Sequence, residues 1–167
     1  SDALKASGGP FLFGAFSALW ASYALHLQHE HPAWGTAVDG LFGLAGIAGA
    51  LIAPTMGRAA DLLGPEYVFG RALICLFVAL ALFAAWPGQV AVEALAIILL
   101  DIGIQAAMVC NQTVIYALRP AARSRINCVY MIVYFIGGTS GTALAVPAWT
   151  AAGWPGVLGV CAAFAAA

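Results

Sequence analysis

Long apolar runs separated by short polar breaks dominate this chain, and their lengths predict helices that cross a membrane. A helix needs about 20 apolar residues to cross the hydrocarbon core of a bilayer. The breaks read QHEHPAWGT, GRAADLLGPEYV, WPGQ, RPAARSR and TAAGW. They leave six candidate spans, at about residues 10–27, 37–56, 69–86, 91–118, 126–150 and 154–167. The last span is still apolar at residue 167 and too short to cross, so we expect a longer protein that continues at both ends.

The composition supports the same interpretation. Hydrophobic residues make up 63% of the chain and charged residues only 8%, whereas about a quarter of an average soluble domain is charged. Six Lys and Arg and seven Asp and Glu residues are too few to cover the surface of a soluble protein of this length. We therefore predict an all-α integral membrane protein. The net charge of −1 says nothing about nucleic acid, and no basic run suggests nucleic acid as a partner.

The basic residues are distributed unevenly between the breaks. If the spans alternate in direction, the N-terminus, the second break and the fourth break lie on one side of the membrane. Every Lys and Arg lies in or beside those segments, with Arg71 just inside the third span: Lys5, Arg58, Arg71, Arg119, Arg123 and Arg125. Cytoplasmic loops are enriched in Lys and Arg. The pattern therefore predicts that these loops are cytoplasmic.

The span at 91–118 carries an unusual polar face, centred on LDIGIQAAMVCNQ at residues 100–112. At about 100° per residue, Asp101, Gln105 and Gln112 fall in one stripe, which Glu93 and Asn111 flank. An ionisable side chain in the bilayer is costly unless it faces protein or water. Two interpretations stay open: the face lines a pathway for a solute or ion, or its side chains form hydrogen bonds with neighbours such as Asn127, Tyr130 or Tyr134.

Other spans have distinctive faces as well. The first carries an aromatic stripe, and the fifth places Tyr134 on one face with small residues that include Gly138 and Gly141. The second repeats glycine every third residue, a spacing that lets helix backbones approach closely in lipid, and the third is apolar on all sides, as expected of a lipid-facing helix. The aromatic stripe consists of Phe13, Phe16, Trp20 and Tyr23, and the glycine stripe of Gly40, Gly43, Gly46 and Gly49.

Two stretches resemble the major facilitator superfamily. Gly57, Arg58, Asp61 and Gly64, in GRAADLLGPEYVFGR, resemble its loop motif G-x-x-x-D-x-x-G, although PE stands where the family has a basic pair. The stretch from LDIGIQ through NQTVIYAL, ARSRIN, VYM and FIGG is similar to arabinose- and drug-efflux-like permeases, in the same order. Together with GLFGLAGIAGALIAPTMGRAAD, the resemblance covers nearly the whole chain.

The resemblance implies a fold. The chain would be the C-terminal six-helix half of a twelve-helix transporter, built as two inverted three-helix repeats. In that family the first and fourth helices of a half line the central cavity, and the third and sixth face lipid. Asp61 would lie near the N-terminal end of the third span, where the helix dipole favours a carboxylate. Arg58, Arg123 or Arg125 could then pair with it and latch one conformation.

The resemblance also implies a function, which is secondary active transport by alternating access. We expect proton-coupled efflux of a small organic solute, a sugar or a drug, across a bacterial inner membrane. The partners would be the missing N-terminal half, the lipid bilayer, the solute and protons, with no cofactor, metal or enzymatic activity. The chain has no Walker A pattern, which disfavours ATP-driven pumping. The expected pathway residues are Asp101, Gln105, Asn111, Gln112, Phe16, Trp20, Tyr23 and Tyr134, with Asp101 as the local candidate for proton coupling.

Two alternatives belong to other functional classes. The stretch HLQHEHPAW around the first outer break gathers His26, His29, Glu30 and His31, which are metal ligands by type. Their spacing matches no helical HExxH motif, and we expect these side chains to be solvated. The second alternative is a membrane scaffold that transports nothing, or a six-helix half-transporter that works as a dimer.

Overall fold

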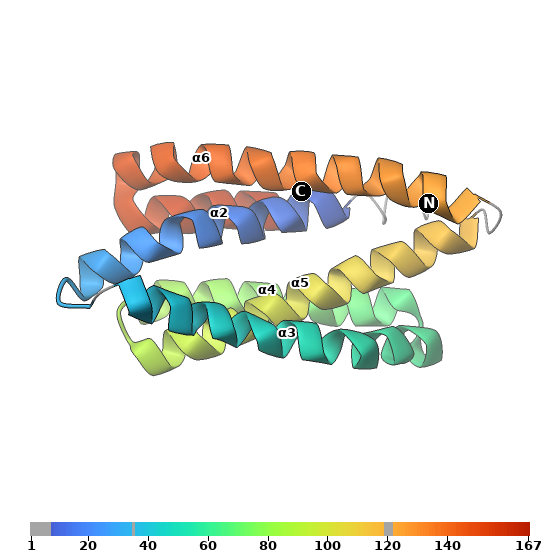
Figure 1. Ribbon diagram of the computed structural model, residues 1–167, viewed down its shortest axis with the longest axis horizontal. Coiled ribbons are helices and arrows are strands. Elements are labelled where there is room, and N and C mark those ends of the chain that lie inside the picture. Colours follow the sequence, from blue (N-terminus) through green and yellow to red (C-terminus); the bar gives the residue numbers. More distant parts are fainter. Residues whose placement is uncertain (1–7, 35, 119–121) are drawn as a thin grey trace.

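The computed structural model describes residues 8–34, 36–118 and 122–167, and nearly all of them are helical. The helices are α2 (Gly8–Glu30), α3 (Thr36–Leu63), α4 (Pro65–Ala85), α5 (Val90–Leu118) and α6 (Arg123–Ala166). They run roughly along one common axis (Figure 1). The prediction of an all-α protein is therefore confirmed. Four of these helices, α2, α4, α5 and α6, are long and apolar enough to cross a membrane.

Helix α6 contains a reversal of direction. Gly153 has φ 62° and ψ −148°, which is a conformation that glycine adopts and residues with a Cβ avoid. The segments before and after Gly153 are helical, and the second folds back beside the first (Figure 1). Pro155 follows in the first turn of the returning segment, where its missing N–H is tolerated. The predicted break between residues 150 and 154 coincides with this turn.

A single residue, Gly64, joins α3 to α4. Its φ of 89° ends one helix, and Pro65 begins the next. The sequence predicted a polar loop over 57–68, but those residues extend α3 through Leu63 and start α4 at Pro65. Hydropathy shows where a helix leaves lipid and not where it stops being helical, because the polar residues of this stretch also accept helical geometry.

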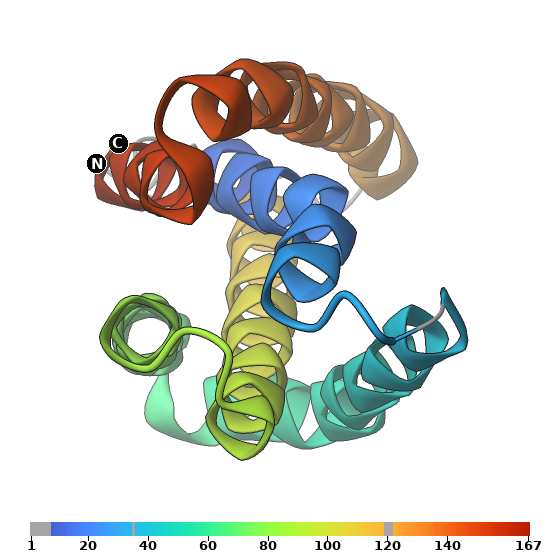
Figure 2. The same cartoon turned by 90° about the vertical axis from the view of Figure 1, so that its left-hand side faces the viewer.

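The helices form two groups. Helix α2 packs against both segments of α6, while α5 packs against α3 and α4. Seen from the end, α5 extends from the side of α3 toward α2 and α6 and so connects the two groups (Figure 2). Leu19, Leu76, Phe83, Ile97 and Leu100 belong to one core in which each is almost fully buried.

The outer surface is apolar and several buried side chains are polar. Ile74, Phe77, Val129 and Ile132 are exposed on α4 and α6, and the buried set includes Ser22, His26, Glu93, Asp101 and Asn111. A soluble protein avoids large exposed apolar patches, but a bilayer stabilises them. Together with the long apolar helices, this distribution identifies an integral membrane protein.

Glycines bring α2 and α6 into backbone contact. A Cβ atom on Gly137 would overlap the backbone of Pro10, and one on Gly138 would lie 2.5 Å from the Phe13 ring. The glycine stripe predicted for the second span behaves differently, since a Cβ atom on Gly40 or Gly43 would meet nothing within 4 Å. The expectation of close packing is therefore wrong for these two positions within the chain. Gly46 and Gly49 lie outside the residues whose surroundings are described.

The basic residues of the described segments lie toward one end of the bundle. Arg58 is in the last turns of α3, Arg71 in the second turn of α4, and Arg123 and Arg125 in the first turn of α6. Figure 1 shows that these helix ends share one side of the molecule. The turns at the other end, residues 31–34, 86–89 and 153, contain no Lys or Arg. Lys5 and Arg119 lie outside the described residues.

Candidate functional site

The polar face of α5 is buried in the bundle. Asp101 is 5% exposed and Asn111 is 3% exposed, while Gln105 and Gln112 are half-buried. The Oδ2 atom of Asp101 makes no hydrogen bond to any described residue. A carboxylate oxygen buried without a donor costs more than a lost hydrogen bond. The position of Asp101 is therefore difficult to explain by stability alone.

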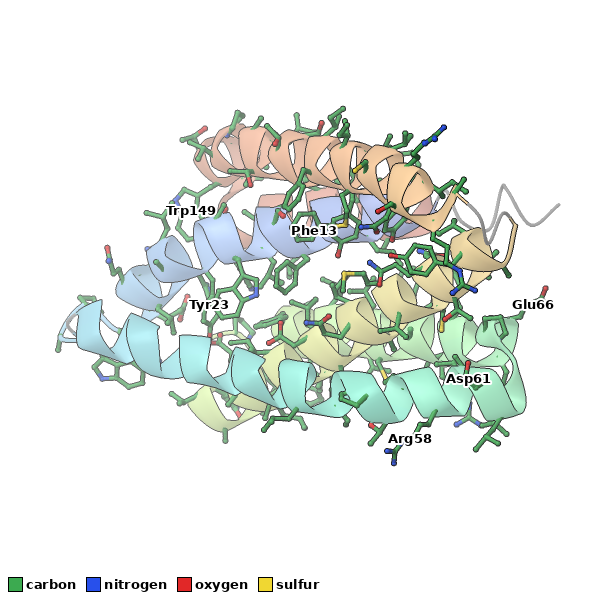
Figure 3. All side chains as sticks on the ribbon, turned by 45° about the vertical axis from the view of Figure 1, so that its right-hand side comes forward. Phe13, Tyr23, Arg58, Asp61, Glu66 and Trp149 are labelled. Atoms are coloured by element: carbon green, nitrogen blue, oxygen red, sulfur yellow. The ribbon has the colours of Figure 1, made fainter. Side chains whose placement is uncertain are left out.

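The aromatic stripe on α2 forms a continuous ladder. Ring centroids are 5.8 Å apart for Phe13 and Phe16, 6.2 Å for Phe16 and Trp20, and 6.0 Å for Trp20 and Tyr23. Phe13 also stacks on Tyr134 of α6 at 4.2 Å. Figure 3 shows Phe13 and Tyr23 on the side of α2 that faces the interior of the bundle. The ladder runs along the middle of α2, and its role in a pathway stays a prediction.

The predicted hydrogen-bonding partners of Asp101 are engaged elsewhere or lie against other groups. Asn127 accepts a hydrogen bond from Tyr116 at 2.7 Å. Asn111 and Tyr130 both lie against the α2 backbone, where a Cβ atom on Gly9 would be 2.6 Å from Asn111 Nδ2 and 2.5 Å from Tyr130 Oη. Trp20 is the polar neighbour of Asp101, yet its Nε1 also has no hydrogen-bond partner in the described part of the chain.

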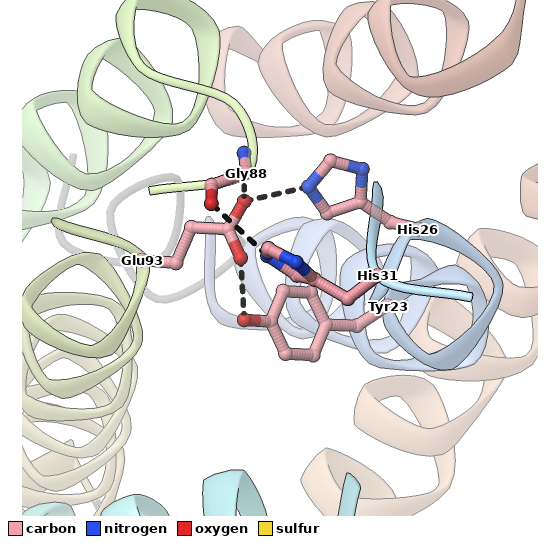
Figure 4. A network of polar contacts seen from close by, with 5 residues as sticks. All are labelled: Tyr23, His26, His31, Gly88 and Glu93. Atoms are coloured by element: carbon pink, nitrogen blue, oxygen red, sulfur yellow. Dashed lines mark hydrogen bonds and ion pairs between the residues drawn. The ribbon is translucent and has the colours of Figure 1, made fainter. Parts of the chain in front are cut away.

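The structure reveals a second polar site that the sequence did not predict. Glu93, in the first turn of α5, accepts hydrogen bonds through both carboxylate oxygens (Figure 4). Tyr23 Oη donates to Oε2 at 2.9 Å, and the Gly88 N–H donates to Oε1 at 2.9 Å. His26 Nε2 lies 2.6 Å from Oε1. The side chains of His26 and Glu93 are 1% and 0% exposed.

Aromatic rings enclose the histidine of this network. Trp154, just after the Gly153 turn, stacks on the His26 ring with centroids 4.0 Å apart and an interplanar angle of 12°. Tyr23 and Phe83 each contact Trp154 as well. The Glu93 network therefore brings together α2, the turn before α5, α5 itself and the returning segment of α6.

The histidines of the first outer break do not share one environment. His26 belongs to α2 and is buried against Glu93, so the expectation that its side chain is solvated is wrong. His29 and Glu30 are exposed on the last turn of α2, and His31 is half-buried, with Nε2 3.1 Å from the carbonyl oxygen of Gly88. Within the described ranges, no three His, Cys, Asp or Glu side chains come together as metal ligands.

Sequence patterns gave only a partial signal for the Glu93 network. Tyr23 and His26 continue the aromatic stripe of α2 at a helical interval of three residues. Glu93 is conspicuous because it interrupts an apolar run. Their association, however, joins positions 67 residues apart, and no local pattern encodes it.

The motif residues Gly57, Arg58 and Asp61 lie on α3, and Gly64 forms the link to α4. Asp61 was expected near the N-terminal end of the third span, but it lies in the last turn of α3, at a helix C-terminus. The helix-dipole argument for Asp61 is therefore wrong, because the predicted loop residues continue α3. Figure 3 shows Arg58 pointing away from the bundle. Among the residues described, neither Arg58, Arg123 nor Arg125 forms an ion pair with Asp61, so the latch stays a prediction.

A cavity of about 710 Å³ opens beside Asp61. Its walls come from the end of α3, the start of α4 and the last turns of α5, and they include Glu66 and Asn111. The cavity lies at the basic end of the bundle. The structure thus brings Asp61 and Asn111 to one cavity, while Asp101 and the Glu93 network lie farther along α5 toward the other end.

Comparisons with known proteins connect this chain to transporters. The chain is 41% identical over 151 residues to the uncharacterized transporter YgaY of Escherichia coli O157:H7, covering 89% of the chain and 38% of the relative. It is 36% identical over 156 residues to the probable transporter SCO4007 of Streptomyces coelicolor, covering 92% of the chain and 36% of the relative. No family model and no solved structure matches. Nearly the whole chain is therefore matched, but it spans little more than a third of the length of these relatives.

Proposed function

We propose that this chain is the C-terminal half of a secondary active transporter of the major facilitator type, which exports a small organic solute in exchange for protons. The observation that carries the proposal is Asp101, a carboxylate 5% exposed in the interior of the apolar helix α5. Ionisable groups at membrane depth are typical of substrate and proton pathways. The names of the bacterial relatives support a transport role.

The packing of the helices supports two inverted repeats. If α2, α3 and α4 form one repeat, then α5 and the two segments of α6 form the other. The first helix of each repeat packs against the second and third helices of the other: α2 against α6, and α5 against α3 and α4. This exchange is what two-fold symmetry between the repeats would produce. It supports a six-span half built around α2 and α5.

The exposed faces support a missing partner half. The chain spans about 38% of one relative and 36% of another, which leaves room for a second set of spans. Gly40 and Gly43 face open space on α3, and small residues of this kind are suited to close contact with another helix in lipid. We place the solute pathway between the halves, along the α5 polar face and the α2 aromatic ladder.

The orientation follows from the basic residues. The described Arg side chains lie toward the end that contains Gly64 and the start of α6. By the positive-inside rule this end is cytoplasmic, in a bacterial inner membrane. The Glu93 network then lies toward the outer surface. A proton arriving from outside would meet Glu93 before Asp101, which lies about 12 Å farther along α5 at 1.5 Å per residue.

Transport by the full-length protein in proteoliposomes tests the proposal. Proteoliposomes that contain the protein are loaded with one sugar or drug of a panel at a time, and a pH gradient is imposed across their membrane. A pH-sensitive dye reports proton movement. We expect Asp101→Asn to reduce proton-driven solute flux at least tenfold. The exposed carboxylate variant Glu30→Gln serves as the control and should retain flux.

Two results would contradict the proposal. If Asp101→Asn moves solute and protons as the unmodified protein does, Asp101 is not the coupling group. If the full-length protein moves no compound of the panel and no protons, a membrane scaffold or another six-helix arrangement becomes the better explanation.

A further inference from the structure

We propose that Glu93 and His26 form a proton-binding site between α2 and α5, with the proton held on the imidazole ring against Trp154. The use of this site in transport rests on the proposed function above, but its existence does not. The site lies at the end of the bundle opposite the described Arg residues and is separate from Asp101.

The hydrogen bonds to Glu93 indicate which atoms of the site carry protons. Glu93 Oε1 accepts from the Gly88 N–H at 2.9 Å, and Oε2 accepts from Tyr23 at 2.9 Å. An ionised carboxylate accepts hydrogen bonds on both oxygens, and these two contacts fit that form. One proton lies in the 2.6 Å contact between Oε1 and His26 Nε2, and we place it on Nε2, which then donates to Oε1.

The other ring nitrogen is the position that can change. His26 Nδ1 is buried and has no hydrogen-bond partner among the described residues. Without a proton on Nδ1, the pair carries one negative charge. With a proton there, imidazolium and carboxylate form a neutral ion pair and all three hydrogen bonds to Glu93 remain. Uptake at Nδ1 therefore needs no rearrangement of the network.

Because the pair is buried, a proton on His26 stabilises the structure by neutralising the charge of Glu93. The two side chains are 1% and 0% exposed, and His26 is the one cationic partner of Glu93 that the described residues provide. An isolated charge in an apolar interior is unfavourable. No Lys or Arg of the described segments pairs with Glu93, so a proton on His26 is what can neutralise it.

Trp154 is arranged to favour the charged ring. The His26 and Trp154 rings are nearly parallel, with centroids 4.0 Å apart. A cation over the face of an indole is attracted by the ring quadrupole, most strongly when water is excluded. Phe83 and Tyr23 complete the surrounding wall, and these contacts exclude water from the ring face.

The other titratable groups near His26 and Glu93 come from α2 and from the connection that follows it. On α2, Tyr23 donates to Glu93, His29 is exposed, and the Oε2 atom of Glu30 would lie 2.8 Å from a Cβ atom on Gly88. In the following connection, His31 bonds the carbonyl oxygen of Gly88. The contributions of α4 and α6 are Phe83 and Trp154, which are uncharged.

The site therefore couples proton binding to helix packing. The neutral pair holds α2, the turn before α5 and the returning segment of α6 together, whereas the unprotonated pair leaves a buried charge that hydration would relieve. In the proposed transporter, proton uptake from the outer side would favour closure of this end, and proton release would favour its opening.

Tryptophan fluorescence of the purified full-length protein tests the site without any solute. An imidazolium quenches indole emission more strongly than neutral imidazole does, so Trp154 should report a pH-dependent transition between pH 5 and 9. The Trp154→Phe variant identifies its share of the signal. Trp34 stacks on His31 with centroids 4.0 Å apart, and Trp149 lies 6.2 Å from His29, so only the part of the transition that Trp154→Phe removes is assigned to this site. We expect His26→Gln to abolish that part. Glu93→Gln should move its midpoint down by about 1–3 pH units, because an opposite charge at this distance favours the imidazolium by that amount.

A second variant keeps the test informative if Glu93→Gln misfolds. Tyr23→Phe removes one donor to the carboxylate but preserves the ring. The less stabilised carboxylate should attract the proton more strongly, so the midpoint should move up. A merely structural role would not produce shifts of opposite sign. A transition unchanged by His26→Gln, or absent from the unmodified protein, would overturn the site.

The two proposals fail separately. If the transition behaves as expected but the protein moves no solute or protons, the proton site stands and the transport function is wrong. If proton-driven transport is observed and no transition depends on His26, transport stands and this site is wrong.

Discussion

Gly141 of α6 lies so close to Gly14 of α2 that a Cβ atom added to Gly141 would overlap the carbonyl oxygen of Gly14. One turn earlier, Gly137 meets the backbone of Pro10 in the same way. In lipid no hydrophobic drive holds helices together, so close backbone packing contributes more of the association. The α2–α6 contact is therefore the part of the fold most sensitive to added volume.

Gly141→Ala should lower the thermal stability of the full-length protein. The methyl group can be accommodated only by separating the helices, and overpacking of this kind costs about 1–3 kcal/mol. Thermal unfolding followed by size-exclusion chromatography in detergent measures the effect. Gly159→Ala is the matched control, since a Cβ atom there would meet nothing within 4 Å. Equal melting temperatures for the two variants would contradict the packing described here.

Gly153→Ala should destabilise the reversal within α6. The backbone at this residue has φ 62° and ψ −148°, and forcing a residue with a Cβ into such a region costs about 1–3 kcal/mol. The same unfolding assay applies. Gly70→Ala in α4 provides the comparison, because it adds a methyl group in open space on a regular helix and should be neutral or slightly stabilising. A Gly153→Ala protein as stable as Gly70→Ala would exclude the observed turn.

The two buried carboxylates of α5 should respond in opposite ways to amide substitution. Asp101→Asn removes a charge whose Oδ2 has no donor, so stability should be unchanged or higher. Glu93→Gln brings an amide NH₂ toward groups that donate to the carboxylate, and it should cost about 1–3 kcal/mol. Melting temperatures of the two variants, measured side by side at pH 7, decide the matter. The reverse order would mean that Asp101 is the structural carboxylate.

Labelling from outside intact cells should distinguish the two ends of the bundle. In a background without native cysteines, Gln89→Cys should react with a membrane-impermeant maleimide, because its turn lies at the end without Lys or Arg. Leu62→Cys, at a position 84% exposed near the opposite end, should react only after the cells are permeabilised. Labelling of Leu62→Cys in intact cells, or of both variants from one side, would contradict the proposed orientation.

Much of the fold follows from local sequence. The apolar runs predicted where the helices lie because lipid demands about 20 apolar residues per crossing, and the break near residue 153 coincides with Gly153. The polar face of α5 was also readable, since helical periodicity alone places Asp101, Gln105 and Gln112 together. The end of α3 could not be predicted from the sequence, because polar residues after the apolar run continue the helix until the positive φ of Gly64.

The sequence by itself determined which segments are helical, which face of α5 is polar and that the basic residues gather on one side. These properties depend on composition and on intervals of three or four residues. Only the tertiary structure decided that His26 is buried against Glu93 and stacked on Trp154, that Gly141 meets Gly14, and that Gly40 faces outward. Such contacts depend on how helices distant in sequence pack and rotate against one another, which is a property of the whole bundle.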